Sequence, residues 1–338
     1  MSIEMLGITV LWSFLYGYLI VASIDFGAGF FAYYGRVIGM ESIIGPVISR
    51  YLSPVWEVTN VFLVFFFVGI VGFFPETAHY YGTSLLIPGS IALVLLSIRG
   101  SFYAFANYGA GKSGFYLLAY GATGLLIPAS LSTVFTISEG GFLDVRGSSV
   151  TLLMEELFFS SYSWAVVLLA MSSVLFISST FLTYYASRAE DKRAFEQMRF
   201  FSLWGGIPTL ISSLFVFVAL RNHNLEHFDR ALRVWWLFGL SLVAFALAVW
   251  LIWQKKSLGL AFVLVMLQFA FAFFGYGQSH LPYLLYPDLT IYGGVTNETM
   301  GRALVVAFLA GFALLVPSIV LLLRLFLFNA KYVKGELT

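Results

Sequence analysis

Two carboxylates stand inside apolar segments of this chain, and they are the residues best suited to carry chemistry. Asp25 interrupts the helix-length run WSFLYGYLIVASIDFGAG, residues 12–29, and Glu57 stands just inside the next run, SPVWEVTNVFLVFFFVGIVGFF, residues 53–74. A charged side chain at membrane depth costs about 2.5–3.5 kcal/mol on insertion scales, so it faces protein or water and marks a functional site. Because a carboxyl group in apolar surroundings can take up and release protons, proton transfer is the predicted chemistry.

Arg99 is the cation that can pair with one of these acids. It lies in the stretch LSIRGSFYAF, near the end of a third apolar segment. An ion pair with Arg99 would make Asp25 a fixed packing element, whereas a protonatable Asp25 would relay protons, and the sequence leaves both roles open. For Glu57 the sequence also leaves two roles open, a proton relay or a hydrated side chain at the membrane surface. We read Arg99 as structural and expect no catalytic residue in this chain.

The histidines predict neither a metal site nor a haem site. All four stand near the ends of apolar segments, at His79, His223, His227 and His280. His223 and His227 are spaced i, i+4 in RNHNLEHFDR, which would suit a metal ion if that loop were helical. We favour a polar outer loop instead, and we expect no metal ligand and no axial histidine for a haem in the membrane core.

Composition restricts the protein to one class. Of its 338 residues, 60% are hydrophobic and 10% charged, and the mean hydropathy is +0.91, so the chain is a polytopic membrane protein. The net charge is +1 and no run of basic residues is present, so the sequence offers no surface suited to nucleic acid. The absence of cysteine excludes disulfides and metal sites with thiolate ligands. Aromatic residues make up 19% and mostly suit lipid contact, although Trp56 and Phe62 could line a hydrophobic path for a gas or a quinone.

The elements that must position these residues are membrane-spanning helices. A helix that crosses a bilayer core about 30 Å thick needs roughly 20 apolar residues, and this length criterion predicts about nine spans in an all-α fold. The predicted spans are residues 5–34, 54–74, 83–106, 114–137, 161–186, 200–220, 231–253, 258–277 and 302–328. The first is read as a retained span, because the N-terminus has no basic region and no cleavage site. The charged connection at residues 187–200 leaves four spans before the fifth and four after it, which hints at two four-helix bundles.

Loop charges orient the spans. When the N-terminus is placed outside, 13 of the 18 Lys and Arg residues fall on the inner side, which is the asymmetry of the positive-inside rule. Asp25 then lies about nine residues, or roughly 13 Å, from the inner end of its span. Glu57 is expected only a few residues past the inner start of the second span, so that the two acids form a staircase leading inward from the cytoplasm.

The motifs resemble subunit II of the cytochrome bd-type quinol oxidases along essentially the whole chain. The matching stretches, in order, are GYLIVASIDFGAG, PVWEVTNVFLVFF, FFPETAHYYG, IRGSFYAF and YPDLTIYGGVTNETM. The usual W-D-G-N-x-V-W of the family reads here as WEVTNVF, which keeps a carboxyl at Glu57 but puts Val58, Thr59 and Phe62 in place of Gly, Asn and the second Trp.

The resemblance implies a haem-free subunit paired with a subunit I that holds two b-type haems and one d-type haem. Quinol and oxygen would be the substrates of the complex, with Asp25 and Glu57 on a cytoplasmic proton path. The implied fold is two four-helix bundles, residues 1–137 and 200–338, with a peripheral fifth helix inside residues 138–199. The implied location is the bacterial cytoplasmic membrane, with the C-terminus cytoplasmic. A bound quinone and a small single-span accessory subunit stay open.

Two other readings of the buried acids also stay open. A proton-coupled secondary transporter would place Asp25 in a glycine-rich bundle, although inverted repeats and mid-depth polar residues for a solute are missing. A purely structural membrane scaffold would lock Asp25 to Arg99.

Overall fold

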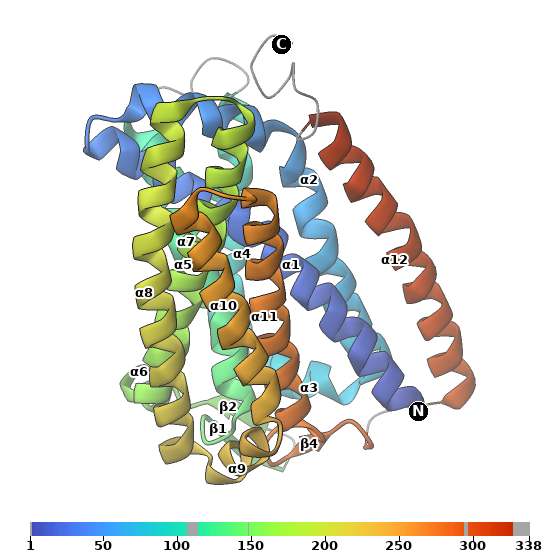
Figure 1. The fold of residues 1–338 in the computed structure, drawn as a ribbon. Helices are drawn as coiled ribbons and strands as arrows, with labels where there is room; N and C mark the ends of the chain where they lie inside the picture. The colour runs from blue at the N-terminus through green and yellow to red at the C-terminus, as the bar shows by residue number, and fades with distance from the viewer. Residues whose placement is uncertain (1, 107–113, 148, 294–296, 327–338) are drawn as a thin grey trace.

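The computed structural model describes residues 2–106, 114–147, 149–293 and 297–326, with the side chains of residues 50–58, 103–106, 298, 322–323 and 325–326 left out. Long helices run between two ends of the molecule (Figure 1). They are α1 (Ile3–Val37), α2 (Glu41–Phe73), α4 (Leu86–Ala106), α5 (Gly114–Ser138), α7 (Ser161–Arg188), α8 (Lys192–His223), α10 (Trp235–Gln254), α11 (Leu258–His280) and α12 (Glu298–Phe326).

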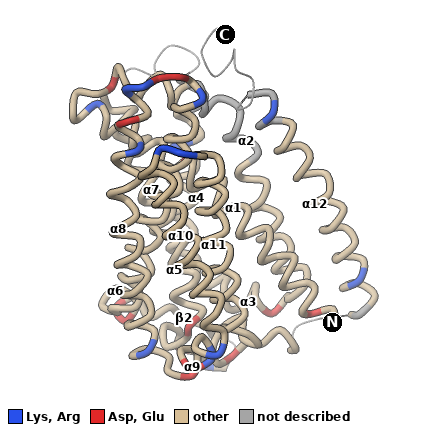
Figure 2. Tube along the Cα trace, in the orientation of Figure 1, with Lys and Arg blue, Asp and Glu red and all other residues tan. Residues whose placement is uncertain are grey.

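Short elements close one end of the molecule. They are the helices α3 (Glu76–Ser84), α6 (Met154–Phe159) and α9 (Leu225–Arg233) and the hairpins β1–β2 (Leu143–Arg146, Ser149–Leu152) and β3–β4 (Tyr283–Leu285, Leu289–Thr290). Lys and Arg gather at the opposite end, where α7 joins α8 and α10 joins α11 (Figure 2). The loops therefore differ in both structure and charge between the two ends.

The all-helical membrane class is confirmed. Among the described residues, seven helices are long and apolar enough to span a membrane, and the pair α3 and α4, bent by 74°, makes an eighth if it counts as one span. In α2 the described side chains form a shorter apolar stretch, Thr59–Phe73.

Polar side chains set several helix starts. Ser2 accepts a hydrogen bond from the Met5 amide at the start of α1, and Ser160 does the same for Ser163 at the start of α7. The Asp191 carboxylate accepts from two amides at the start of α8, so the charged connection predicted at residues 187–200 ends one helix and caps the next.

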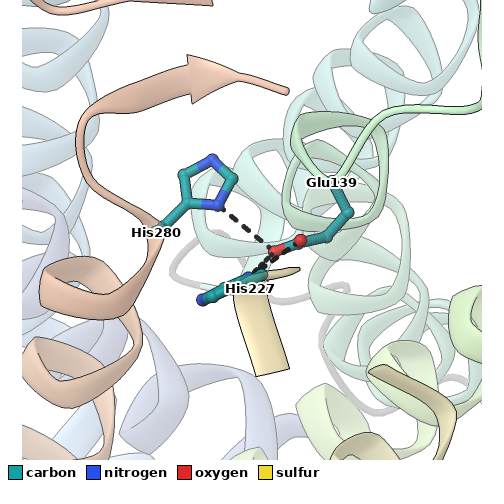
Figure 3. Close-up of side chains that lie close together, drawn as sticks. All are labelled: Glu139, His227 and His280. Atoms are coloured by element: carbon teal, nitrogen blue, oxygen red, sulfur yellow. Dashed lines mark hydrogen bonds and ion pairs between the residues drawn. The ribbon is translucent and has the colours of Figure 1, made fainter. Parts of the chain in front are cut away.

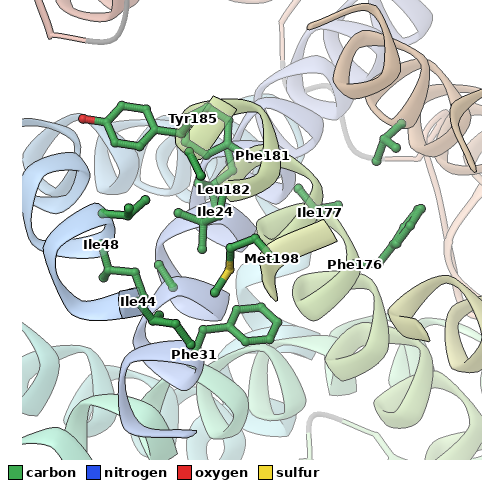
Figure 4. Close-up of a cluster of buried hydrophobic side chains, with 14 of the residues drawn as sticks. Ile24, Phe31, Ile44, Ile48, Phe176, Ile177, Phe181, Leu182, Tyr185 and Met198 are labelled. Atoms are coloured by element: carbon green, nitrogen blue, oxygen red, sulfur yellow. The ribbon is translucent and has the colours of Figure 1, made fainter. Parts of the chain in front are cut away.

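The largest core cluster joins the first helices to α7 and α8. Ile24 and Phe31 of α1 meet Ile44 of α2, Phe181 of α7 and Met198 of α8 (Figure 4). A second cluster joins α1 and α2 to α12 around Phe14 and Phe308. Helix α1 takes part in both clusters and packs against α2, α5, α7, α11 and α12, so it lies at the centre of the bundle.

The expectation of a peripheral fifth span differs from the packing. This span is α7, which packs against α1, α5, α8 and α11 and has 61% of its most apolar stretch buried, against 17% for α12. Small hydroxyl residues explain the close packing: Ser178 donates to the Ile24 carbonyl at 2.9 Å, and Thr180 bonds Ser202 at 2.8 Å. The least buried span is instead α12, which lies on α1 and α2.

Candidate functional site

Asp25 and Arg99 form a buried ion pair between α1 and α4. Arg99 Nε lies 2.9 Å from Asp25 Oδ2, and both side chains are almost completely buried. The guanidinium also donates to the Asp25 carbonyl at 2.6 Å and the Tyr120 carbonyl at 2.9 Å. The Tyr120 hydroxyl lies 3.4 Å from Asp25 Oδ1. The ion pair allowed by the sequence is therefore present, and it is one part of a larger polar cluster.

Aromatic rings and glycines shape the pocket around Arg99. The guanidinium carbon lies 4.2 Å from the centre of the Tyr120 ring and 5.1 Å from that of Phe26, so two ring faces stabilise its charge. A Cβ atom at Gly29 would lie 2.9 Å from Arg99 Nη1, and one at Gly124 would lie 2.2 Å from the Phe26 carbonyl oxygen. Only glycine at these two positions lets α5 approach α1 closely enough to enclose the pair.

Trp56 and Glu57 lie in α2, but their side chains fall outside the described residues. The backbone register of α1 and α2 nevertheless changes the expected position of Glu57. A Cβ on Gly35 would touch Ile44, and one on Gly17 would touch Phe62. In both pairs the two residue numbers add up to 79, as expected for antiparallel helices in one register. A residue of α2 therefore lies level with the residue of α1 whose number is 79 minus its own.

Residue 57 then faces about residue 22 of α1, which is about one helical turn from Asp25. On this backbone register residue 57 is not nearer the inner end of the helices than Asp25, which differs from the expected order. The difference arises because α2 begins at Glu41, well before the apolar run that starts at Ser53. The place of the Glu57 side chain stays a prediction. The two acidic positions lie nearly side by side rather than as a staircase.

A cavity of about 370 Å³ is lined by residues of α1, α2, α5, α7, α8, α9, α10 and α11. Its lining is almost entirely apolar, but Tyr18, Tyr162 and Gln268 place polar groups on its wall. Within the described part of the chain, the Tyr18 hydroxyl and the Gln268 side-chain oxygen have no hydrogen-bond partner. Phe62 does not line this cavity; it packs over Gly17 in the contact between α1 and α2.

A second polar cluster lies at the end of the molecule that carries the hairpins. It joins Glu139, directly after α5, to His227 of α9 and His280 at the end of α11 (Figure 3). His227 Nδ1 lies 2.8 Å from Glu139 Oε1, and His280 Nδ1 lies 3.4 Å from the same oxygen. The Tyr276 hydroxyl donates to Glu139 Oε1 at 2.6 Å, and the Asn224 amide donates to Oε2 at 3.2 Å.

The electrostatics of this cluster favour a charged carboxylate. Burial alone would raise the pKa of the Glu139 carboxyl, but the hydrogen bond with His227 and the nearby His280 ring outweigh it and hold the pKa well below its usual range. Glu139 is therefore a buried anion at neutral pH.

The histidine prediction needs correction. His227 is fully buried, and His280 is only 7% exposed, so buried histidines do end the spans at this side. His223 is not the partner of His227, because α8 ends at His223 and its Nε2 bonds the Gly140 carbonyl at 3.0 Å. The expected polar outer loop is a helix, α9, whose His227 faces inward. Glu139 was overlooked because its position next to a predicted loop suggests a solvated acid.

Comparisons with known proteins agree on one family. Residues 3–326 match the family described as cytochrome bd terminal oxidase subunit II. A curated protein of Bacillus subtilis (strain 168), provisionally named a cytochrome bd menaquinol oxidase subunit II, is 32% identical over 342 residues, which cover 98% of each protein. A chain in the structure of the bd oxidase from Geobacillus thermodenitrificans is 57% identical, with a TM-score of 0.86 over 97% of this chain and 100% of that one.

Proposed function

This chain belongs to the family of cytochrome bd terminal oxidase subunit II, and from that premise we propose that it is the haem-free subunit of its oxidase and supplies a cytoplasmic proton path. A bd-type quinol oxidase is an oxidoreductase complex. The haems of such a complex, two of the b type and one of the d type, would reside in subunit I and supply the electron transfer to oxygen. The transporter reading is not retained.

The observation that supports the proton path is the way Arg99 is held beside Asp25. Three acceptors other than the carboxylate bind the guanidinium: the carbonyls of Asp25 and Tyr120 and the Thr123 hydroxyl at 3.3 Å. Because these contacts do not depend on the charge of the Asp25 carboxyl, Arg99 can stay in place while that carboxyl takes up and releases a proton. Glu57, about one turn away on α2, is the neighbouring acid that would exchange protons with it.

The haem-free proposal rests on the histidines of the described residues. His227 is the histidine that lines the large cavity, and its two ring nitrogens already contact Glu139 and Ser279. A haem iron in that cavity would have to break one of these buried contacts to gain an axial ligand.

The cavity instead suits a bound quinone, a ligand that the sequence leaves open. Its walls are apolar, as an isoprenoid chain requires, and Tyr18 and Tyr162 in its lining carry hydroxyls that can donate to the carbonyl oxygens of a ring. Solvent extraction of the purified complex should yield less quinone from a Tyr18→Phe, Tyr162→Phe double variant than from the wild type. Equal yields would remove this ligand from the proposal.

We also propose how the helices are grouped and oriented. The first bundle is α1, α2, α4 and α5, the second is α7, α8, α10 and α11, and α12 is the peripheral ninth span; the contacts within each group support this division. The end rich in Lys and Arg would face the cytoplasm, with the N-terminus outside. Subunit I would be the partner in the bacterial cytoplasmic membrane, and a small accessory subunit and lipid complete the expected surroundings.

Purification in mild detergent tests the assignment. The tagged chain should be isolated from its native membrane with one large partner, and the reduced-minus-oxidised spectrum should contain the bands of haem b and haem d. The same chain produced without that partner should give no haem bands. A colourless lone chain from well-preserved membranes would contradict the complex, and haem bands from the isolated chain would contradict its haem-free role.

A further inference from the structure

We propose that Glu139, His227 and His280 form a binding site for a divalent transition-metal ion of the zinc class at the end of the bundle that carries the hairpins. Each residue offers one ligand atom, and the three atoms lie within 4.8 Å of one another. Two imidazole nitrogens and one carboxylate oxygen are a donor set that suits zinc. All three residues are buried, and they come from separate parts of the chain.

His280 is the first reason to expect a ligand rather than a closed hydrogen-bond network. Its side chain is nearly buried. Among the described residues Nε2 has no hydrogen-bond partner, and Nδ1 has only the long contact to Glu139 at 3.4 Å. Leaving such a group unsatisfied costs about 1–3 kcal/mol. The ring stacks on Tyr276 with centroids 5.7 Å apart and planes within 10°, and this contact aims Nδ1 at the Glu139 carboxylate (Figure 3).

The separation between His280 and Glu139 fits a shared metal ion. Their facing atoms are 3.4 Å apart, which is long for a charge-assisted hydrogen bond. Two ligands bound tetrahedrally at about 2.0–2.2 Å from zinc lie roughly 3.3–3.6 Å apart. The His227 ring, now 2.8 Å from the carboxylate, would have to move outward by about 0.5–0.8 Å to reach that separation.

The tautomer of His227 gives an independent reason. Ser279 donates its hydroxyl hydrogen to the Tyr276 carbonyl at 2.8 Å, so it accepts from His227 Nε2 at 2.7 Å. A neutral His227 with its hydrogen on Nε2 turns the lone pair of Nδ1 towards the Glu139 oxygens. A cation must lie between them, either a proton or a metal ion. A partner on the second nitrogen is also what metal-binding histidines normally have.

The surrounding charges are compatible with this site. Arg230 is the nearest cation on the same helix, and it is directed to Glu226 and to the Ser279 carbonyl at 2.8 Å rather than to Glu139. Tyr276 and Asn224 hydrogen-bond the carboxylate and would orient it. The ion would join the end of α5 to α9 and α11, and so connect two groups of helices at the end opposite the Lys-rich loops.

Zinc content of the purified complex tests the site without relying on activity. The complex is stripped with a chelator, equilibrated with ZnCl₂ and desalted, and zinc is counted per haem d by mass spectrometry. His280→Ala should retain one zinc ion fewer than the wild type, because it removes a ligand and, besides that, only the long contact to Glu139. His223→Gln, which changes a neighbouring histidine outside the cluster, should retain as much as the wild type.

X-ray absorption at the zinc edge provides the second measurement on the unaltered complex. The wild type should contain a zinc ion with two imidazole ligands and oxygen at about 2.0–2.2 Å, and this signal should be missing from His280→Ala. Equal zinc content in the wild type and His280→Ala would overturn the proposal and leave a proton on His227 as the cation. Loss of zinc in His223→Gln to the same extent would also overturn it.

Discussion

At the scale of single residues, the Asp25–Arg99 pair explains why two charges persist in apolar helices. Each would be costly alone, and together they are buried with hydrogen bonds and two ring faces around the guanidinium. Removing one member of a buried pair leaves the other uncompensated, which typically costs about 3–5 kcal/mol. The pair is therefore structural in any case, and the proposed proton path adds a second role for Asp25.

Arg99→Ala should lower the yield of assembled complex and its thermal unfolding temperature, because it strands the Asp25 carboxylate. Adding Asp25→Asn to this variant should restore part of the loss, since the uncompensated charge is then gone. Differential scanning fluorimetry on the three proteins measures both effects. A double variant no more stable than Arg99→Ala would mean that the hydrogen bonds of Arg99 to backbone, and not the ion pair, hold the helices.

Glu57→Gln should slow quinol-driven oxygen consumption about as much as Asp25→Asn does, since the register puts the two positions about one turn apart. The sequence alone suggested a smaller loss, based on a shallow Glu57. Glu41→Gln, at the exposed start of the same helix, is the control and should turn over at the wild-type rate. Normal turnover of Glu57→Gln beside a slow Asp25→Asn would show that protons reach Asp25 without α2.

At the scale of elements, close approach of α1, α5 and α7 encloses the pair. This approach depends on glycine and hydroxyl residues, whose small volume lets the backbones meet. The same feature explains why α7 is central: Ser178 and Thr180 fit against neighbouring helices.

Gly124→Ala should destabilise the complex by about 1–3 kcal/mol, because its Cβ would overlap the Phe26 carbonyl. Gly89→Ala in α4 is the matched control: its Cβ would have no neighbour closer than 3.9 Å, and helix propensity predicts a gain of up to about 1 kcal/mol. Thermal unfolding of the two variants gives the comparison. Equal midpoints would argue against the close contact of α1 and α5.

At the scale of the whole molecule, loop charge and helix direction together predict which end faces the cytoplasm. The chain has no cysteine, so a single introduced cysteine reports the side of the membrane. Arg146→Cys, in β1, should react with an impermeant maleimide in intact cells. Lys256→Cys, between α10 and α11, should react only after the membrane is opened. The reverse pattern would invert the orientation.

Much of this architecture is predictable from the sequence, and the exceptions have physical causes. Long apolar runs define spans, and isolated charges within them have few partners, which is why Asp25 and Arg99 could be paired in advance. The depth of Glu57 could not, because α2 continues through the polar residues that precede its apolar run. The Glu139 cluster could not either, since its members stand beside different loops and only the packing of helix ends brings them together.

Turnover of the Asp25→Asn complex is the measurement that tests the proton path most directly. Oxygen consumption per haem d should fall by about tenfold or more while the haem content and the subunit ratio stay normal. Asp25→Glu, which keeps a titratable carboxyl, should retain most of the activity. Wild-type turnover in a fully assembled Asp25→Asn complex would contradict the relay and leave Asp25 as a packing element locked to Arg99.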